Sequence, residues 1–381
     1  MFFDFRSFFR FMYLVYFRSR DVNFPLTPKR ALGFGIYFLL FPIFELFTAA
    51  CLLLDHVFFP GFRRISIDKP LFIVGHPRSG TTYLQGLIAK DDELFFSFRV
   101  WETIFPSILQ KKVLAWIGRF DQQHGGRLKA MILRRQERLL GHYDDIHDMG
   151  LFELAEDDRL LMHTVCVPIG QLLLMNATQL DWIFYFDEQA REKDRIRVMK
   201  FFRACIQRQS YYKGGNRILL TKAPLAGLRV KSLYRFFPGC RMIYTLRNPL
   251  AAVPSILDLG RRHFEANADM ENWPAQQTRL YPFLREMFRY PLASLQQADP
   301  ATCEIIIHDH LLRRPGDVVR ACYKKFGYSL SPRYDELLKH EGEKQRNFTS
   351  RHKTTLNEFN LTPEQIRSDF KDVFDRCAFE T

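Results

Sequence analysis

The sequence predicts an α/β fold in which a P-loop-like parallel sheet is flanked by helices and preceded by an N-terminal hydrophobic helical segment. Four apolar runs, expected as buried strands, alternate with helical patterns and cover residues 71–74, 217–222, 240–246 and 304–308. Strands that alternate with helices pair in parallel through right-handed crossovers. A chain of 381 residues, 47% of them hydrophobic, is also sufficient for a large buried core.

Charge and cysteine content narrow the classes of partner. The formal net charge is +13, which suits nucleic acid, an anionic membrane surface or an anionic cofactor. No zinc-finger spacing or RNA-binding aromatic pattern is present, so no nucleic-acid partner is predicted. The seven cysteines are scattered and form no C-x-x-C pair, which indicates reduced buried thiols and favours a cytosol-facing catalytic domain.

Residues 1–66 are expected to form a membrane-associating segment ahead of a catalytic domain over residues 67–381. Phenylalanines alternate there with Arg6, Arg10 and Arg18, a combination typical of interfacial helices. The apolar run over 31–54 has the length to cross a bilayer, but Pro42 and Glu45 interrupt it. An interfacial or re-entrant segment is therefore predicted. A spanning helix and a helical pair packed on the catalytic domain are the alternatives.

The first strand leads into a glycine-bounded loop and a helix, reading Gly75-His76-Pro77-Arg78-Ser79-Gly80-Thr81-Thr82. Free backbone N–H groups and the dipole of the helix N-terminus favour an anion at this loop. The spacing is that of a Walker P-loop, but Thr81 replaces the lysine that reaches the β- and γ-phosphates. Arg78 supplies the cation instead, and its guanidinium suits a phosphate or sulfate.

Two further strands are followed by cations at their carboxyl ends, where open α/β sheets bind ligands. Lys222 ends the run over 217–222, and Arg247 follows the run over 240–246. Ser255 lies eight positions after Arg247 (255 − 247 = 8), about two turns into the next helix. Arg247 and Ser255 can therefore reach the same phosphate.

These motifs resemble the sulfotransferase family, whose sulfuryl donor is 3′-phosphoadenosine 5′-phosphosulfate (PAPS). Residues 77–82 match its pattern P-[RK]-[ST]-G-[TS]-[TS], and Arg247-Asn248-Pro249 with Ser255 matches its 3′-phosphate motif. The resemblance spans residues 70–370, roughly, and is to a bacterial-type branch related to protein-tyrosine and carbohydrate sulfotransferases. It implies PAPS as donor and no metal, with the 5′-phosphosulfate bound by Arg78, Ser79, Gly80, Thr81 and Thr82.

The resemblance also implies catalytic roles. Lys222, in a K-x-P motif, would stabilise the leaving phosphate together with Arg78. Glu102, in a Glu-Thr pair, or His147, in an H-x-M-G segment, would be the catalytic base. A late basic segment with Arg351 and His352 would fold over the cofactor, whereas His308 stands where many members have tyrosine.

The expected reaction is transfer of the sulfuryl group from PAPS to a hydroxyl. The membrane segment and an aromatic-rich middle region hint at a lipid or amphiphilic acceptor. A nucleotide kinase or ATPase, disfavoured by the missing Walker lysine, and a non-catalytic membrane-bound nucleotide-binding protein are the alternatives. A bacterial source would place the catalytic domain in the cytoplasm, and a eukaryotic source would allow a Golgi-type lumenal location.

Overall fold

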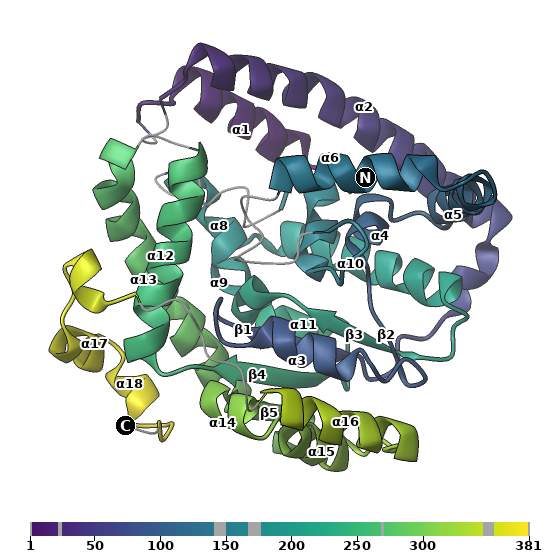
Figure 1. Ribbon diagram of the computed structural model, residues 1–381. Helices are drawn as coiled ribbons and strands as arrows, with labels where there is room; N and C mark the ends of the chain where they lie inside the picture. Colours follow the sequence, from purple (N-terminus) through teal and green to yellow (C-terminus); the bar gives the residue numbers. More distant parts are fainter. Residues whose placement is uncertain are drawn as a thin grey trace.

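A computed structural model describes residues 2–21, 25–140, 150–166, 177–267, 270–345 and 354–379. Within these ranges, five parallel strands form one sheet in the order β2-β3-β1-β4-β5 (Figure 1). The strands are β1 (Leu71–Gly75), β2 (Phe95–Phe96), β3 (Ile218–Lys222), β4 (Arg241–Leu246) and β5 (Cys303–Ile307). The predicted parallel α/β fold is confirmed, and the two-residue strand β2 was not predicted.

Helices cover both faces of the sheet, and the alternation of side chains along β1 shows how. Phe72 and Val74 pack into one apolar core, and Leu71 and Ile73 pack into a second one. Successive side chains of a strand point to opposite faces, so a strand buried on both sides is apolar throughout. This arrangement explains why the run over 71–74 contains no polar residue.

The helices divide between the two faces according to these cores. The first core contains residues of α10 (Glu192–Tyr212), α11 (Val230–Phe236), α12 (Pro249–Asn267) and α13 (Trp273–Leu295). The second contains residues of α3 (Thr81–Ile88), α14 (His308–Arg313), α15 (Pro315–Phe326) and α16 (Pro332–Gln345). Shorter elements of the domain are α4 (Val100–Ile104), η2 (Asp157–Thr164), α8 (Asp181–Phe184), α9 (Phe186–Gln189), α17 (Pro363–Asp369) and α18 (Lys371–Phe374).

Four helices lie on the side of the molecule away from α14–α16 (Figure 1). They are α1 (Phe5–Phe17), α2 (Pro28–Phe58), α5 (Ile108–Gln123) and α6 (Arg127–Leu140). The Thr27 hydroxyl accepts a hydrogen bond from the N–H of Arg30 at the start of α2, with Pro28 at its first position. The helix continues through Pro42. Among the described residues, α2 is the single helix whose length and apolar composition would allow it to cross a membrane.

Candidate active site

The loop after β1 has the geometry of an anion-binding turn. Gly75 approaches β4 so closely that a Cβ atom there would lie 2.4 Å from Thr245 Oγ1, which explains the glycine. Arg78 and Gly80 both have positive φ, at 66° and 88°. This conformation is costly for arginine, and such strain is found mainly where function requires it. Within the described residues, no side chain caps α3, so its first N–H groups face the loop.

Two arginines and a serine meet beside this loop. Arg78 Nε donates a hydrogen bond to Ser255 Oγ at 3.2 Å, and Arg247 Nη1 lies 3.4 Å from the carbonyl oxygen of Arg78. Burial lowers the pKa of Arg247, and the neighbouring Arg78 lowers it further. Arg247 Nε is buried without a hydrogen-bond partner among the described residues. Adjacent cations with an unpaired buried donor fit a multiply charged anion such as a phosphate.

Two histidines line the loop as neutral groups. Burial lowers the pKa of His76 to about 3. Its Nε2 accepts a hydrogen bond from the N–H of Arg247 at 3.1 Å, its Nδ1–H donates to the Pro77 carbonyl, and its ring stacks on Phe288. His308 begins α14 beside Gly80, and burial also lowers its pKa. Both histidines therefore border the arginines without adding charge.

Lys222, at the end of β3, reaches the first turn of α3. Its Nζ donates to Thr82 Oγ1 at 2.9 Å and lies 2.5 Å from Glu156 Oε1. The lysine side chain is 3% exposed, whereas that of Glu156 is 29% exposed. The pair therefore presents a carboxylate at the edge of the loop that follows β1. The predicted position of Lys222 beside the loop agrees with this geometry.

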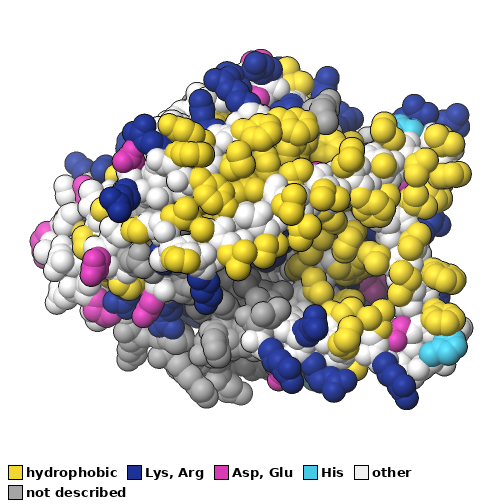
Figure 2. Space-filling view, turned by 90° about the horizontal axis from the view of Figure 1, so that it is seen from above, with side chains coloured by type: hydrophobic (Ala, Val, Ile, Leu, Met, Phe, Trp, Pro, Cys, Tyr) yellow, Lys and Arg dark blue, Asp and Glu magenta, His cyan; other side chains and the backbone are white. Residues whose placement is uncertain are grey.

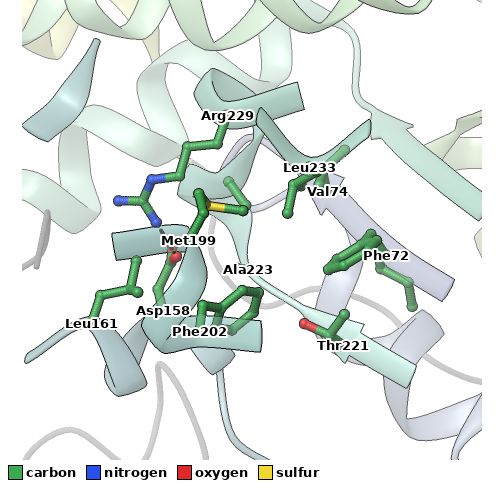
Figure 3. Close-up of a pocket in the computed structure, with 12 residues that line it drawn as sticks. Phe72, Val74, Asp158, Leu161, Met199, Phe202, Thr221, Ala223, Arg229 and Leu233 are labelled. Atoms are coloured by element: carbon green, nitrogen blue, oxygen red, sulfur yellow. Dashed lines mark hydrogen bonds and ion pairs between the residues drawn. The ribbon is translucent and has the colours of Figure 1, made fainter. Parts of the chain in front are cut away.

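The acidic cluster around Glu156 continues inward. Burial raises the pKa of the Asp157 carboxyl well above its ordinary value. Asp158 pairs with Arg229, whose guanidinium also lies over the Phe186 ring. Figure 3 shows Asp158 and Arg229 on one side of a cavity of about 20 Å³ behind β1 and β3. The cavity has room for about one water molecule and is not a nucleotide site.

Several predicted site residues have other surroundings. Ser79 is fully buried, and its hydroxyl donates to the His76 carbonyl at 2.6 Å and contacts Thr245. Thr81 is also buried, so the side chains of Ser79 and Thr81 expose little surface at the loop. His147, Arg351 and His352 lie outside the described residues.

Glu102 is fully buried at the start of α4. Its Oε2 accepts a hydrogen bond from the N–H of Arg99 at 2.8 Å, and its Oε1 lies 2.8 Å from Lys213 Nζ. The carboxylate thus caps the helix and pairs with the end of α10. A catalytic role of Glu102 stays a prediction.

Sequence reasoning did not assign roles to Glu156 and His76. Glu156 was one of several carboxylates between Glu153 and Asp158, and sequence order alone does not identify which of them contacts Lys222. His76 follows a strand and precedes Pro77, so its position in the loop was visible, but its bond to the distant Arg247 was not. The position of His76 directly after Gly75, the last residue of β1, is the sequence signal that could have indicated a role for this histidine.

The fold is that of a sulfotransferase. A sulfotransferase family model matches residues 70–332, more than half of the chain, and the chain belongs to this family. A curated relative, omega-hydroxy-beta-dihydromenaquinone-9 sulfotransferase Stf3 of Mycobacterium tuberculosis and of Mycobacterium bovis, is 21% identical over 324 residues. That match covers 82% of this chain and 76% of the relative. The predicted family is confirmed.

Two solved structures share the overall fold. The crystal structure of sulfotransferase STF9 from Mycobacterium avium has a TM-score of 0.75 at 18% identity. That match covers 99% of this chain and 93% of the STF9 chain. The crystal structure of sulfotransferase STF1 from Mycobacterium tuberculosis has a TM-score of 0.69 at 16% identity. That match covers 96% of this chain and 92% of the STF1 chain. Because these matches extend beyond residues 70–332, the likeness in fold includes the N-terminal helices.

Proposed function

We propose that the protein transfers a sulfuryl group from PAPS to a hydroxyl of a lipid or amphiphilic acceptor and releases adenosine 3′,5′-bisphosphate. The observation that carries the proposal is the meeting of Arg78, Arg247 and Ser255 beside the phosphate loop. A second phosphate site next to the first suits a nucleotide that carries both a 5′- and a 3′-phosphate. The unpaired Arg247 Nε is a donor for the 3′-phosphate.

In this proposal the two ends of the site have separate tasks. Arg247 and Ser255 hold the 3′-phosphate, while Arg78 and the N–H groups of α3 hold the phosphosulfate. The acceptor oxygen forms a bond to sulfur, and the bond from sulfur to the bridging oxygen breaks. The electron pair of the broken sulfur–oxygen bond stays on that oxygen, which becomes part of the departing 5′-phosphate. Lys222 neutralises the charge that develops on this oxygen, which lowers the barrier.

A carboxylate beside Lys222 takes the proton of the acceptor hydroxyl. Glu156 is the better placed of the two described candidates, because it is partly exposed and contacts Lys222. When Lys222 turns to the leaving oxygen, Glu156 loses this contact and its carboxylate can accept a proton. Glu102 and His147 remain the alternative bases, and Glu102 would have to give up the N-cap of α4 to act.

A lipid acceptor is supported by the name of the relative Stf3, which describes a hydroxylated menaquinone as its substrate. The aromatic and apolar N-terminal helices support a place at a membrane surface. For a bacterial source, the proposal places the catalytic domain in the cytoplasm. A Golgi-type lumenal location is the alternative for a eukaryotic source. The transfer itself uses no metal in this proposal, since arginine, lysine and backbone N–H groups supply the positive charge.

The test of the donor is a thermal-shift titration with adenosine 3′,5′-bisphosphate, AMP and Mg-ATP. We expect a large stabilisation by the bisphosphate that needs no magnesium and is lost in Arg247→Ala. Lys324→Ala, on the exposed side of α15, is the control for removal of a cation. Equal stabilisation by AMP and the bisphosphate would contradict the 3′-phosphate site, and preferential binding of Mg-ATP would favour a kinase or ATPase.

A further inference from the structure

Exposed apolar side chains form stripes on the helices opposite α14–α16. On α1 the stripe contains Phe5, Phe9, Tyr13 and Phe17, which are four positions apart and 45–73% exposed. On α2 it contains Leu32, Leu39, Leu46 and Leu53, which are seven positions apart and 66–71% exposed. Positions at these spacings share one side of a helix. Figure 2 shows that apolar side chains dominate this side of the molecule.

Helix α5 extends the same surface beyond the N-terminal segment. Trp116 is 61% exposed, Phe120 is 53% exposed, and their rings stack on each other. Soluble monomers rarely expose contiguous apolar patches beyond a few hundred Å². The stripe on α2 alone, from Leu32 to Leu53, is about 32 Å long at the helical rise of ~1.5 Å per residue. An exposed apolar surface of this extent indicates a site of contact with a membrane or with another protein.

The other side of α2 is bonded to the catalytic domain. Glu45 Oε1 lies 2.9 Å from His163 Nδ1, and Thr48 Oγ1 accepts a hydrogen bond from Gln110. Asp55 accepts hydrogen bonds from the N–H groups of Ile108 and Leu109. All three α2 side chains are at most 3% exposed. To cross a bilayer, α2 would have to leave this interface and bring two acidic side chains into hydrocarbon, which is costly.

Basic side chains lie around the apolar surface. Helix α6 contains five of them, Arg127, Lys129, Arg134, Arg135 and Arg138, against the single acid Glu137. Arg6, Lys29, Lys112 and Arg119 are exposed on α1, α2 and α5. Lysine and arginine next to an apolar face are suited to the phosphates of anionic lipids, and each contributes to binding near the bilayer surface. A second copy of this chain carries the same positive charge and would therefore not explain this rim.

We propose that α1, α2, α5 and α6 together form a docking surface for one leaflet of an anionic phospholipid bilayer, with α2 lying in the plane of the membrane rather than crossing it. The apolar side chains enter the boundary between headgroups and acyl chains, and the basic side chains of α6 bind the phosphates. The inference does not depend on the sulfuryl-transfer reaction.

The first test is flotation of the full-length protein with vesicles of phosphatidylcholine alone or mixed with phosphatidylglycerol. We expect flotation with the mixed vesicles, weaker binding to phosphatidylcholine, and weakening by salt. The double variant Arg134→Glu/Arg135→Glu should bind the mixed vesicles about tenfold more weakly or worse. Lys324→Glu/Lys371→Glu changes the same charge on exposed positions of α15 and α18 and should bind like the wild type. Equal weakening in both variants, or no flotation, would overturn the proposal.

The second test reports which residues enter the lipid. Trp116 is largely exposed, whereas Trp101, Trp182 and Trp273 are partly buried in the protein. Vesicles with brominated acyl chains should quench wild-type fluorescence, and Trp116→Phe should lose most of this quenching while it still floats. Quenching that is unchanged in Trp116→Phe, or formation of a dimer without vesicle binding, would contradict docking through α5.

The third test separates an in-plane helix from a spanning one. Six cysteines are buried and Cys377 is partly buried, which leaves a low background for thiol labelling. Lys29→Cys and Phe58→Cys place a thiol at either end of α2, each on an exposed position. Both should react with a membrane-impermeant reagent added outside sealed vesicles. Protection of one end and reaction of the other would show a spanning helix and overturn the in-plane arrangement.

Discussion

Asp55 on α2 and Arg208 on α10 form an ion pair with a distance of 2.9 Å between Oδ2 and Nε, inside the protein. The carboxylate also binds the Ser107 hydroxyl and the first N–H groups of α5. One side chain thereby connects the N-terminal helix to two elements of the catalytic domain. The apolar helix of the N-terminal segment is therefore fastened to the enzyme by charge as well as by apolar contact.

We expect Asp55→Ala to lower the free energy of unfolding by about 3–5 kcal/mol, because it leaves Arg208 as a buried charge without its carboxylate partner. Chemical unfolding followed by circular dichroism measures the change. Asp21→Ala removes an exposed ion pair with Arg18 and is the matched control, for which no measurable change is expected. Similar stability of the two variants would show that the buried pair does not hold α2 on the domain.

Lys222→Ala should lower kcat by about 10²–10³-fold, because the charge on the leaving oxygen would lose its stabilising cation. Binding of adenosine 3′,5′-bisphosphate should change far less, since Arg78, Arg247 and Ser255 are retained. Turnover with a hydroxyl acceptor and a thermal-shift titration measure the two effects. Equal losses in turnover and in bisphosphate binding would rule out a role for Lys222 that is specific to the leaving group.

Glu156→Gln should lower kcat by about 10²-fold or more if this carboxylate takes the acceptor proton. The matched variant Glu102→Gln should mainly lower the free energy of unfolding, by about 1–2 kcal/mol, because it weakens the α4 cap and the contact with Lys213. Turnover at saturating donor, measured beside thermal unfolding, separates the effects. The reverse pattern would assign the base to Glu102, and retained activity in both would direct attention to His147→Asn.

The neutral state of His76 predicts a pH dependence of stability. Its pKa falls from 6.5 to about 3 on folding, so the unfolded chain binds this proton more readily. The stabilisation is complete above pH ~6.5 and is lost as the pH falls towards 3. Between pH 7 and pH 5, the wild type should therefore lose about 2 kcal/mol more than His76→Gln.

Unfolding in denaturant at the two pH values measures this difference. His124→Gln replaces an exposed histidine and should follow the wild type at both pH values. Parallel losses in wild type and His76→Gln would show that His76 does not titrate across the folding transition.

Much of the fold and part of the site could be predicted because the signals are local. Residues 71–82 contain the strand, the turn and the start of the helix within a dozen positions, so this unit could be predicted from the sequence. Lys222 and Arg247 follow apolar strands, and parallel strands bring such residues to one edge of the sheet. The contact of Arg78 with Ser255 joins residues 177 positions apart, and only the folded chain reveals it.

By itself the sequence determined the parallel α/β class, the strand, loop and helix over residues 71–88, and the amphipathic, aromatic nature of the N-terminal helices. Periodicity and loop chemistry are properties of neighbouring residues, which explains why they can be read along the chain. Only the tertiary structure decided that Glu156 contacts Lys222, that Glu102 caps α4, and that the acidic side of α2 binds the catalytic domain. These contacts depend on which distant side chain fills the space beside a buried charge, and a buried charge is stable only where packing supplies its partner.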